Sequence, residues 1–340
     1  MFEPAHRELA ELLKETSRSF YLTLRVLPKQ IRPQIGLAYL LARTTDTIAD
    51  TAVLPVGQRL QALEKLRDNI SGNAAPPLEF GELATAQDWP AERALLERCS
   101  ESLATLERTE AADRQRIRDV LATIISGQEL DLRRFAEASA EKIVALADDG
   151  ELDDYTYRVA GCVGEFWTKM CRAHLFPDAM LDEQSFQMKG VRFGKGLQLV
   201  NILRDLPVDL RNGRCYLPAK ELGGANLPPR DLLEPGNLPR FKPLYERYLT
   251  LAEGHLAAGW EYTCAIPRGC KRVRLACAWP IMIGAATLKK LQAGNVLDPD
   301  ERIKVSRAEV RGILLRSVLA QPFPGRWEKL VSFAKPCNPV

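Results

Sequence analysis

Apolar residues recur every three or four positions along almost the whole chain, which is the spacing of one buried face of an α-helix. The stretches "HRELAELLKE" (6–15) and "RLQALEKLRDNI" (59–70) show this pattern. It predicts further helices over 91–108, 114–135, 151–174, 182–206, about 241–263, 268–293 and 307–320. Convincing alternation of the strand type is absent. The pattern therefore predicts an all-α fold, in one domain spanning residues 1–340.

Two stretches, 71–90 and 211–240, interrupt the helical pattern. The second reads "RNGRCYLPAKELGGANLPPRDLLEPGNLPR" and is dense in glycine and proline. We expect it to form a long surface loop, and loops of this length are usually functional or mobile.

Composition places the chain among globular proteins, with 46% apolar and 27% charged residues. Its net charge of +3 argues against nucleic-acid binding, and no protein partner is implied. The stretch "MFEPAHRELAELLKE" has no apolar core of the signal-peptide type, so we expect no signal peptide. No apolar run is long enough for a transmembrane helix. The eight cysteines, without a C-x-x-C pair, are typical of reduced thiols. A cytoplasmic location is expected.

The stretch 301–340 is more basic than the rest of the chain. The basic residues are Arg302, Lys304, Arg307, Arg311, Arg316, Arg326, Lys329 and Lys335, against Glu301, Glu309 and Glu328. A solvated helix face would explain this excess, and so would a surface that meets anionic lipid or a phosphorylated ligand.

A polar stripe runs along the predicted helix that contains "IGLAYLLARTTDTIAD". Tyr39, Arg43, Asp46 and Asp50 lie at spacings of 0, 4, 7 and 11, which is one helix face over three turns. The residues around them are mostly apolar. Charges in such surroundings either mark where the helix reaches water or hold something cationic.

A second predicted helix repeats this arrangement. Gln198, Asn201, Asp205 and Asp209 lie at spacings of 0, 3, 7 and 11 among leucine, isoleucine and valine. One D-x-x-x-D pair is expected by chance about once in a chain of this length. Two pairs, each extending a polar stripe, favour a functional interpretation over two helices that merely end at the surface.

Facing carboxylates on two helices would form an acidic cleft for Mg²⁺, which prefers carboxylate, water and phosphate oxygens. The neighbouring Arg43, Arg204 and Arg214 supply hydrogen-bond donors for the same phosphates. Together these groups indicate a magnesium-dependent diphosphate site. An aromatic wall would shield a carbocation from water. The candidates near the stripes in sequence are Phe20, Tyr39, Tyr155, Tyr157, Phe166 and Phe193.

Five segments carry a resemblance to a known family. They are "SRSF" (17–20), "YLLARTTDTIAD" (39–50), "YTYRVAGCVG" (155–164), "GLQLVNILRDLPVDLRNGRCYLP" (196–218) and "CAWPIMIGAATL" (277–288). In this order they resemble the squalene/phytoene synthases, which are head-to-head prenyltransferases. The first aspartate motif and the last segment look closer to squalene synthases than to phytoene synthases.

The resemblance implies an isoprenoid-synthase helical bundle around a central cavity. The activity would be that of a farnesyl-diphosphate farnesyltransferase of the squalene synthase type. Two farnesyl diphosphates would condense to presqualene diphosphate, which NADPH would then reduce to squalene. Asp46, Asp50, Asp205 and Asp209 would hold Mg²⁺.

The resemblance also assigns roles to other residues. Tyr155 would assist proton removal. The substrate-binding residues would be Arg18, Ser19, Phe20, Tyr39, Arg43, Gln198, Asn201, Arg204 and Arg214. Asn201, Lys304 and Arg307 would contact NADPH.

The sequence departs from the family pattern in three places. Ala49 stands where squalene synthases often carry glutamate, and Gln128 replaces an apolar residue common in relatives. Pro207 lies inside the second aspartate motif, where we expect a kink or a helix end that moves Asp209 off the stripe. We also expect no membrane anchor of the kind seen in many eukaryotic squalene synthases, and a peripheral membrane contact through the basic tail is a hypothesis.

Several other functions are open. The chain could be a dehydrosqualene or phytoene synthase, which performs no hydride step, or it could stop at presqualene diphosphate. A non-catalytic helical protein that binds prenyl lipids is a more remote alternative, because a mere binder has little use for four metal carboxylates.

Overall fold

The computed structural model describes the chain except for residues 1–10, 18–19, 74–77, 332 and 334–340. It divides into two compact units. The N-terminal unit comprises the residues up to 136 together with 169–177, and the C-terminal unit comprises 137–168 and the residues from 178 onward. Helices dominate both units, which confirms the predicted all-α fold. Whether the chain acts as a single domain stays a prediction.

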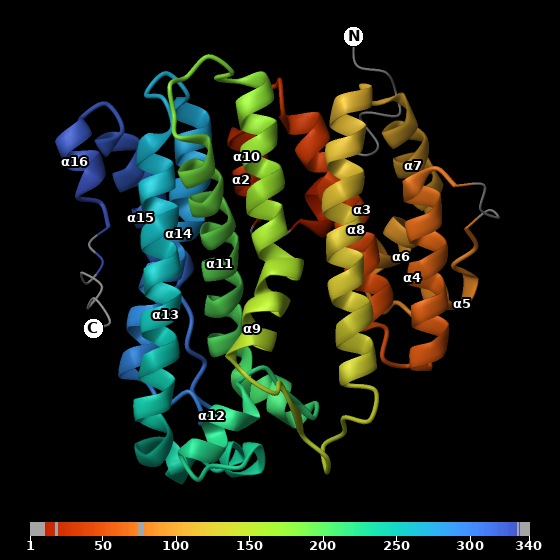
Figure 1. The fold of residues 1–340 in the computed structure, drawn as a ribbon, viewed down its shortest axis with the longest axis vertical. Coiled ribbons are helices and arrows are strands. Elements are labelled where there is room, and N and C mark those ends of the chain that lie inside the picture. The colour runs from red at the N-terminus through yellow and green to blue at the C-terminus, as the bar shows by residue number, and fades with distance from the viewer. Residues whose placement is uncertain (1–10, 18–19, 74–77, 332, 334–340) are drawn as a thin grey trace. The chain divides into compact units, whose positions relative to one another are not determined.

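The N-terminal unit is a helical bundle (Figure 1) in which α3 packs against α4 and α8. Its elements are α2 (Phe20–Val26), α3 (Arg32–Asp50), α4 (Val56–Ser71), α5 (Gly81–Thr85), α6 (Pro90–Glu97), α7 (Cys99–Arg108) and α8 (Ala111–Arg134). The predicted helix over 91–108 is divided at Arg98, which separates α6 from α7. Helix α8 starts earlier than predicted because the Glu110 carboxylate accepts the backbone N–H groups of Ala112 and Asp113.

The C-terminal unit is built on long helices that lie side by side, with α11 against α13 and α13 against α14 (Figure 1). Its helices are α9 (Asp149–Thr156), the π-helix η1 (Tyr157–Gly161), α11 (Glu183–Arg211), α12 (Ala219–Gly224), the 3-10 helices η2 (Pro229–Leu233) and η3 (Pro235–Asn237), α13 (Leu238–Ala265), α14 (Lys271–Ala293), α15 (Arg307–Ala320) and α16 (Pro324–Glu328). Helix α10 (Cys162–His174) contains the boundary between the units.

Two glycines bring the backbones of neighbouring elements of this unit into contact. A Cβ atom on Gly164 would lie 1.9 Å from the carbonyl oxygen of Gly190. A Cβ atom on Gly194 would lie 2.1 Å from the carbonyl oxygen of Ala160. No side chain fits at such distances, so η1 and the start of α10 pack directly on the backbone of α11. This contact fixes the position of η1 along α11, and with it that of Tyr155 in the preceding helix α9.

The expectation of a long surface loop over 211–240 is wrong. This stretch contains the strand β2 (Arg214–Cys215), α12, η2 and η3. Strand β2 pairs in parallel with β1 (Val144–Ala145), the one strand pair found in the described part of the chain. The stretch is anchored by leucines that are at most 1% exposed, namely Leu217, Leu222, Leu227 and Leu232. Its prolines begin the short helices, where a missing N–H group is tolerated.

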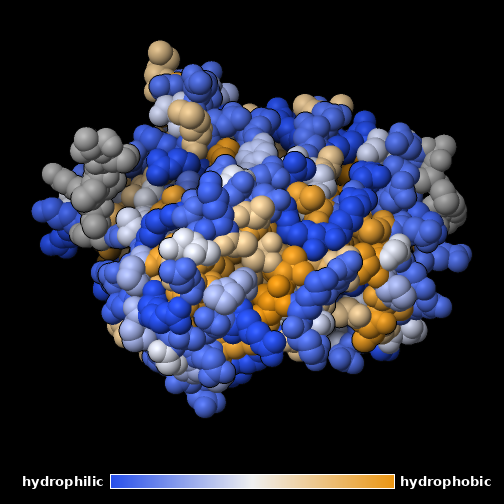
Figure 2. Space-filling view, turned by 60° about the horizontal axis from the view of Figure 1, so that its bottom comes forward, coloured by the Kyte–Doolittle hydropathy of each residue, from blue (hydrophilic) through white to orange (hydrophobic). Residues whose placement is uncertain are grey.

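Hydrophilic residues cover most of the face drawn in Figure 2, and hydrophobic residues gather in patches between them. Among the described residues, no helix is both long enough and apolar enough to cross a membrane.

Candidate active site

The first polar stripe lies on a single helix, as predicted. Tyr39, Arg43, Asp46 and Asp50 all belong to α3, and Asp50 is its last residue. Most positions between them are buried in the N-terminal unit. The side chain of Asp46 keeps 48% of its surface exposed, and Asp50 is exposed as well. A largely buried helix therefore presents two carboxylates about one turn apart.

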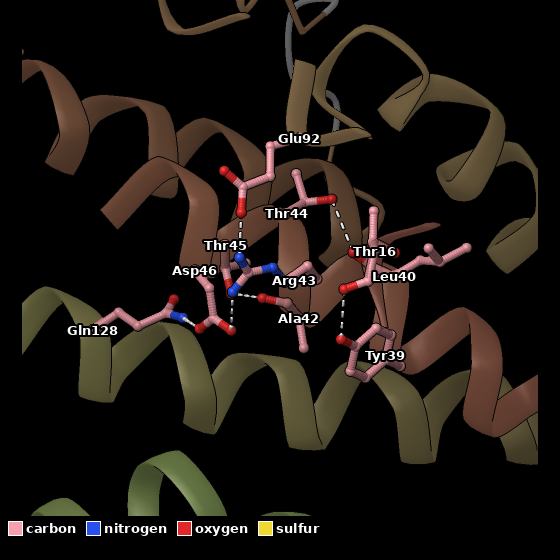
Figure 3. A network of polar contacts seen from close by, with 10 residues as sticks. All are labelled: Thr16, Tyr39, Leu40, Ala42, Arg43, Thr44, Thr45, Asp46, Glu92 and Gln128. Carbon is pink, nitrogen blue, oxygen red and sulfur yellow. Dashed lines mark hydrogen bonds and ion pairs between the residues drawn. The ribbon is translucent and has the colours of Figure 1, made fainter. Parts of the chain in front are cut away.

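Arg43 lies between two carboxylates of the same unit (Figure 3). Its guanidinium forms an ion pair with Glu92 of α6, and its Nη1 atom lies 3.9 Å from Oδ2 of Asp46. Burial lowers the pKa of Arg43, but the charges of Asp46 and Glu92 outweigh that effect and the pKa is raised. Its buried Nε atom has no hydrogen-bond partner among the described residues. Arg43 is thus held in place as a cation with one unused donor.

Asp46 receives a hydrogen bond from a residue of another helix. Nε2 of Gln128, on α8, donates to Oδ1 of Asp46 at 2.5 Å (Figure 3). Partial burial and the negative charge of Asp50 raise the pKa of Asp46 to about 7, although Arg43 and Gln128 act in the opposite direction. The charge of Asp50 therefore disfavours the ionised form of Asp46, and repulsion arises when both carboxylates are ionised.

A divalent cation fits this part of the stripe chemically. It would relieve the repulsion between Asp46 and Asp50, and carboxylate oxygens are ligands that Mg²⁺ accepts. The buried Oε1 atom of Gln128 has no partner in the described structure, so it is free to accept a hydrogen bond from a bound group. Among the described residues, no three histidine, cysteine, aspartate or glutamate side chains form a ready-made metal cluster. Substrate phosphates and water would have to complete the coordination.

The second polar stripe also lies on one helix, α11, which contains Gln198, Asn201, Asp205 and Asp209. Asn201 is exposed and the other three are partly buried. The positions beside them, including Leu199, are buried in the C-terminal unit. The predicted helix and its register are confirmed for this stripe.

Of the kink or helix end predicted at Pro207, the helix end is wrong. Helix α11 passes through Pro207 and continues to Arg211, so Asp209 stays within the helix. Proline has no N–H group, so it cannot donate to the carbonyl of Leu203 one turn earlier. The hydroxyl of Tyr245, on α13, donates to that carbonyl instead, at 3.0 Å. This bond satisfies the group that Pro207 leaves without its usual partner.

Arg204 pairs with its sequence neighbour Asp205 through two hydrogen bonds, of 2.8 and 2.6 Å. The hydrogen bonds that Arg204 donates to Asp205 raise the pKa of Arg204 against the effect of burial, with a smaller contribution from the charge of Asp209. Both side chains keep more than a third of their surface exposed. Arg204 is therefore oriented by the same carboxylate that was predicted to bind metal.

Tyr155 and Arg214 lie near the small β-ladder of the C-terminal unit. Arg214 begins β2, opposite Val144, and is partly buried. The ring of Tyr155 stacks on that of Tyr216, with centroids 4.7 Å apart and an interplanar angle of 25°. Tyr155 is 9% exposed. The following π-helix η1 belongs to a class of distortion that is frequent at functional sites.

The other predicted site residues are less informative. Arg18 and Ser19 lie outside the described residues, and Phe20 is the first residue of α2. Lys304 and Arg307 are exposed, and Arg307 is the first residue of α15.

Sequence reasoning missed two residues that contact the first stripe. Gln128 was noted only as a departure from the family, although a polar residue in the apolar run "ATIISGQELDL" was a usable signal. Glu92 gave no signal, because it lies within an ordinary amphipathic helix, and its pairing with Arg43 depends on how α6 packs against α3.

A helical fold with two arginine–aspartate stripes is what the resemblance predicts, and comparison with known proteins identifies the family. The model of the squalene/phytoene synthase family matches residues 13–309. The chain therefore belongs to this family of head-to-head prenyltransferases.

Two relatives illustrate this membership, and one solved structure shares the fold. A presqualene diphosphate synthase of Zymomonas mobilis is 29% identical over 302 residues, covering 88% of this chain and 89% of that protein. A 15-cis-phytoene synthase of Synechocystis is 28% identical, with 86% and 78% coverage. The complex of TcSQS with the ligand E5700 has a TM-score of 0.77 at 20% identity, covering 92% of this chain and 86% of that one. This last similarity shows the fold alone.

Proposed function

We propose that the protein condenses two farnesyl diphosphates head to head into presqualene diphosphate. The observation that carries this proposal is the α3 stripe, in which Arg43 is fixed beside the mutually repelling carboxylates Asp46 and Asp50. Such an arrangement suits a diphosphate bound together with a divalent cation. Membership of the family and the relative named for presqualene diphosphate support the substrate and the product.

The reaction balances as follows. The C1–O bond of one farnesyl diphosphate breaks, and the diphosphate leaves with the electron pair. The C2–C3 double bond of the second molecule attacks the resulting allylic cation. Loss of one proton then closes the cyclopropane ring. The products are presqualene diphosphate, one free diphosphate and one proton.

The chain's residues have separate tasks in this scheme. Asp46 and Asp50, and likewise Asp205 and Asp209, would hold Mg²⁺, which supplies positive charge to the diphosphates. Arg43, Arg204 and Arg214 donate hydrogen bonds to the phosphate oxygens, and Arg18 is assigned the same role. Tyr155, whose ring is fixed by its stacking on Tyr216, is the candidate for positioning the base that removes the proton.

A reductive second step stays a prediction. The relatives described above are named for presqualene diphosphate and phytoene, so they do not support a need for NADPH. The roles of Asn201, Lys304 and Arg307 toward this cofactor therefore depend on experiment.

Product analysis tests the proposal. Purified protein is incubated with farnesyl diphosphate and Mg²⁺, with and without NADPH, and the extracted products are identified by mass spectrometry. Presqualene diphosphate formed without NADPH supports the proposal, and squalene formed only with NADPH adds the reductive step. Dehydrosqualene formed in both reactions would replace presqualene diphosphate as the product. A product from geranylgeranyl diphosphate alone would overturn the choice of substrate.

A further inference from the structure

Helix α15 exposes an apolar face on the surface of the C-terminal unit. Leu315, Val318 and Leu319 are 61%, 49% and 62% exposed. Their spacing of three and four residues places them on one side of the helix. Phe323, just beyond the helix end, is 52% exposed. These four residues form the outer apolar face, and they are among the largest exposed hydrophobic side chains in the described structure.

The opposite side of α15 already packs in the protein. Ile313, Ser317 and Ala320 are buried, and the Ser317 hydroxyl accepts a hydrogen bond of 2.9 Å from the indole of Trp279 on α14. A helix on the surface normally turns polar residues outward. Helix α15 instead has a second apolar side that the core does not use. A gathering of exposed apolar side chains of this kind indicates an interaction site.

Arginines border the outer apolar face. Rotation by 100° per residue puts Arg311 on this face, with Arg307 and Arg316 on either side of it. All three are exposed, and none forms an ion pair with another described residue. Arg326 is also exposed, and its guanidinium lies over the ring of Phe323, 4.9 Å from the centroid. The rim of the apolar face is therefore cationic.

The nearest acidic residue of the helix does not neutralise these arginines. Glu309 accepts a hydrogen bond from the backbone N–H of Ser306 in a capping box at the start of α15. It is also paired with Lys290 of α14, at 2.9 Å. The positive charge of the rim therefore remains available to a partner.

We infer that α15 and the turn to α16 dock on an anionic membrane surface. Apolar side chains that enter the boundary between headgroups and acyl chains, bordered by arginines that reach the phosphates, are the properties of an interfacial helix. Charge complementarity selects anionic over zwitterionic lipid. The exposed leucines and phenylalanine favour a membrane as the partner, because a purely polar polyanion offers no apolar phase for these side chains to enter. This inference does not depend on the proposed catalytic function.

The experiment is flotation of the full chain with lipid vesicles. One set contains phosphatidylcholine and phosphatidylglycerol, and the other phosphatidylcholine alone. We expect the protein to float with the anionic vesicles and to dissociate from them as the salt concentration is raised. We expect no binding to the neutral vesicles. The double variant Leu315→Gln/Leu319→Gln is expected to bind anionic vesicles at least roughly tenfold more weakly, because two apolar contacts are lost.

Two further variants test the contribution of the arginines to binding and control for the loss of an exposed leucine. Arg311→Ala/Arg316→Ala is expected to weaken binding and to reduce its dependence on salt. Leu251→Gln changes a leucine of α13 that is 44% exposed, and it is the matched control that should bind like the wild type. Circular dichroism and thermal unfolding should be unchanged in all variants, because every altered side chain is exposed.

Three outcomes would overturn the inference. One is wild-type protein that ignores anionic vesicles. Another is a Leu315→Gln/Leu319→Gln variant that binds as tightly as the wild type. The third is a wild-type dimer in solution that this variant abolishes, since the outer apolar face would then belong to a second copy of the chain.

Discussion

The hydroxyl of Tyr245 donates a hydrogen bond of 3.0 Å to the carbonyl oxygen of Leu203, four residues before Pro207. Both residues are buried in the C-terminal unit. This contact takes the place of the backbone bond that proline cannot make, and it keeps the second aspartate stripe helical up to Asp209.

Replacing Tyr245 by phenylalanine should therefore destabilise the protein. The Leu203 carbonyl would be left buried without a donor, at an expected cost of about 1–3 kcal/mol in the free energy of unfolding. Urea unfolding measures this cost. In a Pro207→Ala background the backbone N–H is restored, so Tyr245→Phe should cost less there. Equal costs in the two backgrounds would show that the contact does not compensate for the proline.

Gln128 is expected to position the Asp46 carboxylate for catalysis. Gln128→Leu removes the hydrogen bond to Asp46 at nearly constant volume, and should lower kcat/KM by roughly tenfold or more, the usual effect of losing a residue that orients a ligand. Steady-state kinetics at several magnesium concentrations should show partial recovery as magnesium is raised. Gln115→Leu changes an exposed glutamine of the same helix and should retain full activity. Full activity of Gln128→Leu would remove Gln128 from the site.

The carboxylates of both stripes are expected to be essential for turnover. Asp46→Asn and Asp205→Asn should each lower kcat by at least about a hundredfold, because each removes a charge assigned to metal binding. Product formation from farnesyl diphosphate is the measurement. Circular dichroism should show unchanged helicity. Asp119→Asn, on the solvent side of α8, serves as the neutral control. An active double variant would reject the assignment of the metal ligands.

Stability at low pH should depend on Asp113, whose side chain is 1% exposed. Burial raises its pKa, but hydrogen bonds from His174, Gln34 and Arg116 outweigh burial, and the pKa is lowered. A lowered pKa stabilises the fold above the ordinary pKa of aspartate, about 4, and this contribution is lost as the pH falls below that value.

The free energy of unfolding should thus decrease below about pH 4 more steeply in the wild type than in Asp113→Asn. At neutral pH the variant should be less stable by roughly 1–3 kcal/mol, because an ion pair and charged hydrogen bonds are lost. Urea unfolding across this pH range tests both statements. Parallel curves for the two proteins would show that Asp113 is not the titrating group.

Periodicity was sufficient to predict most of the long helices and both stripes. The register of Tyr39 to Asp50 and of Gln198 to Asp209 is a local property, because side chains at these spacings share a face whenever the segment is helical. The arginines next to the aspartates followed from the same register. The family resemblance covered nearly the whole chain, and the comparison confirmed it.

Contacts between segments far apart in the sequence could not be predicted. The donor that compensates for Pro207 is Tyr245, which lies 42 residues from the carbonyl that it satisfies. Gln128 contacts Asp46 across 82 residues. The stretch 211–240 was misjudged because its glycines and prolines suggested a loop, whereas its regularly placed leucines supply enough buried surface to order short helices.

The close approach at Gly164 and Gly194 has a consequence for how this chain can change. Any β-carbon at either site would strike a carbonyl oxygen, so even alanine would force the η1–α10 backbone away from α11 and displace Tyr155, which α9 holds against Tyr216. In a saturation library these two sites should return glycine alone among functional clones, while the outward positions of α11 accept many residues. The distance between the η1–α10 backbone and α11 thus depends on the absence of side chains at Gly164 and Gly194. Glycine is required at these positions although it has no reactive group.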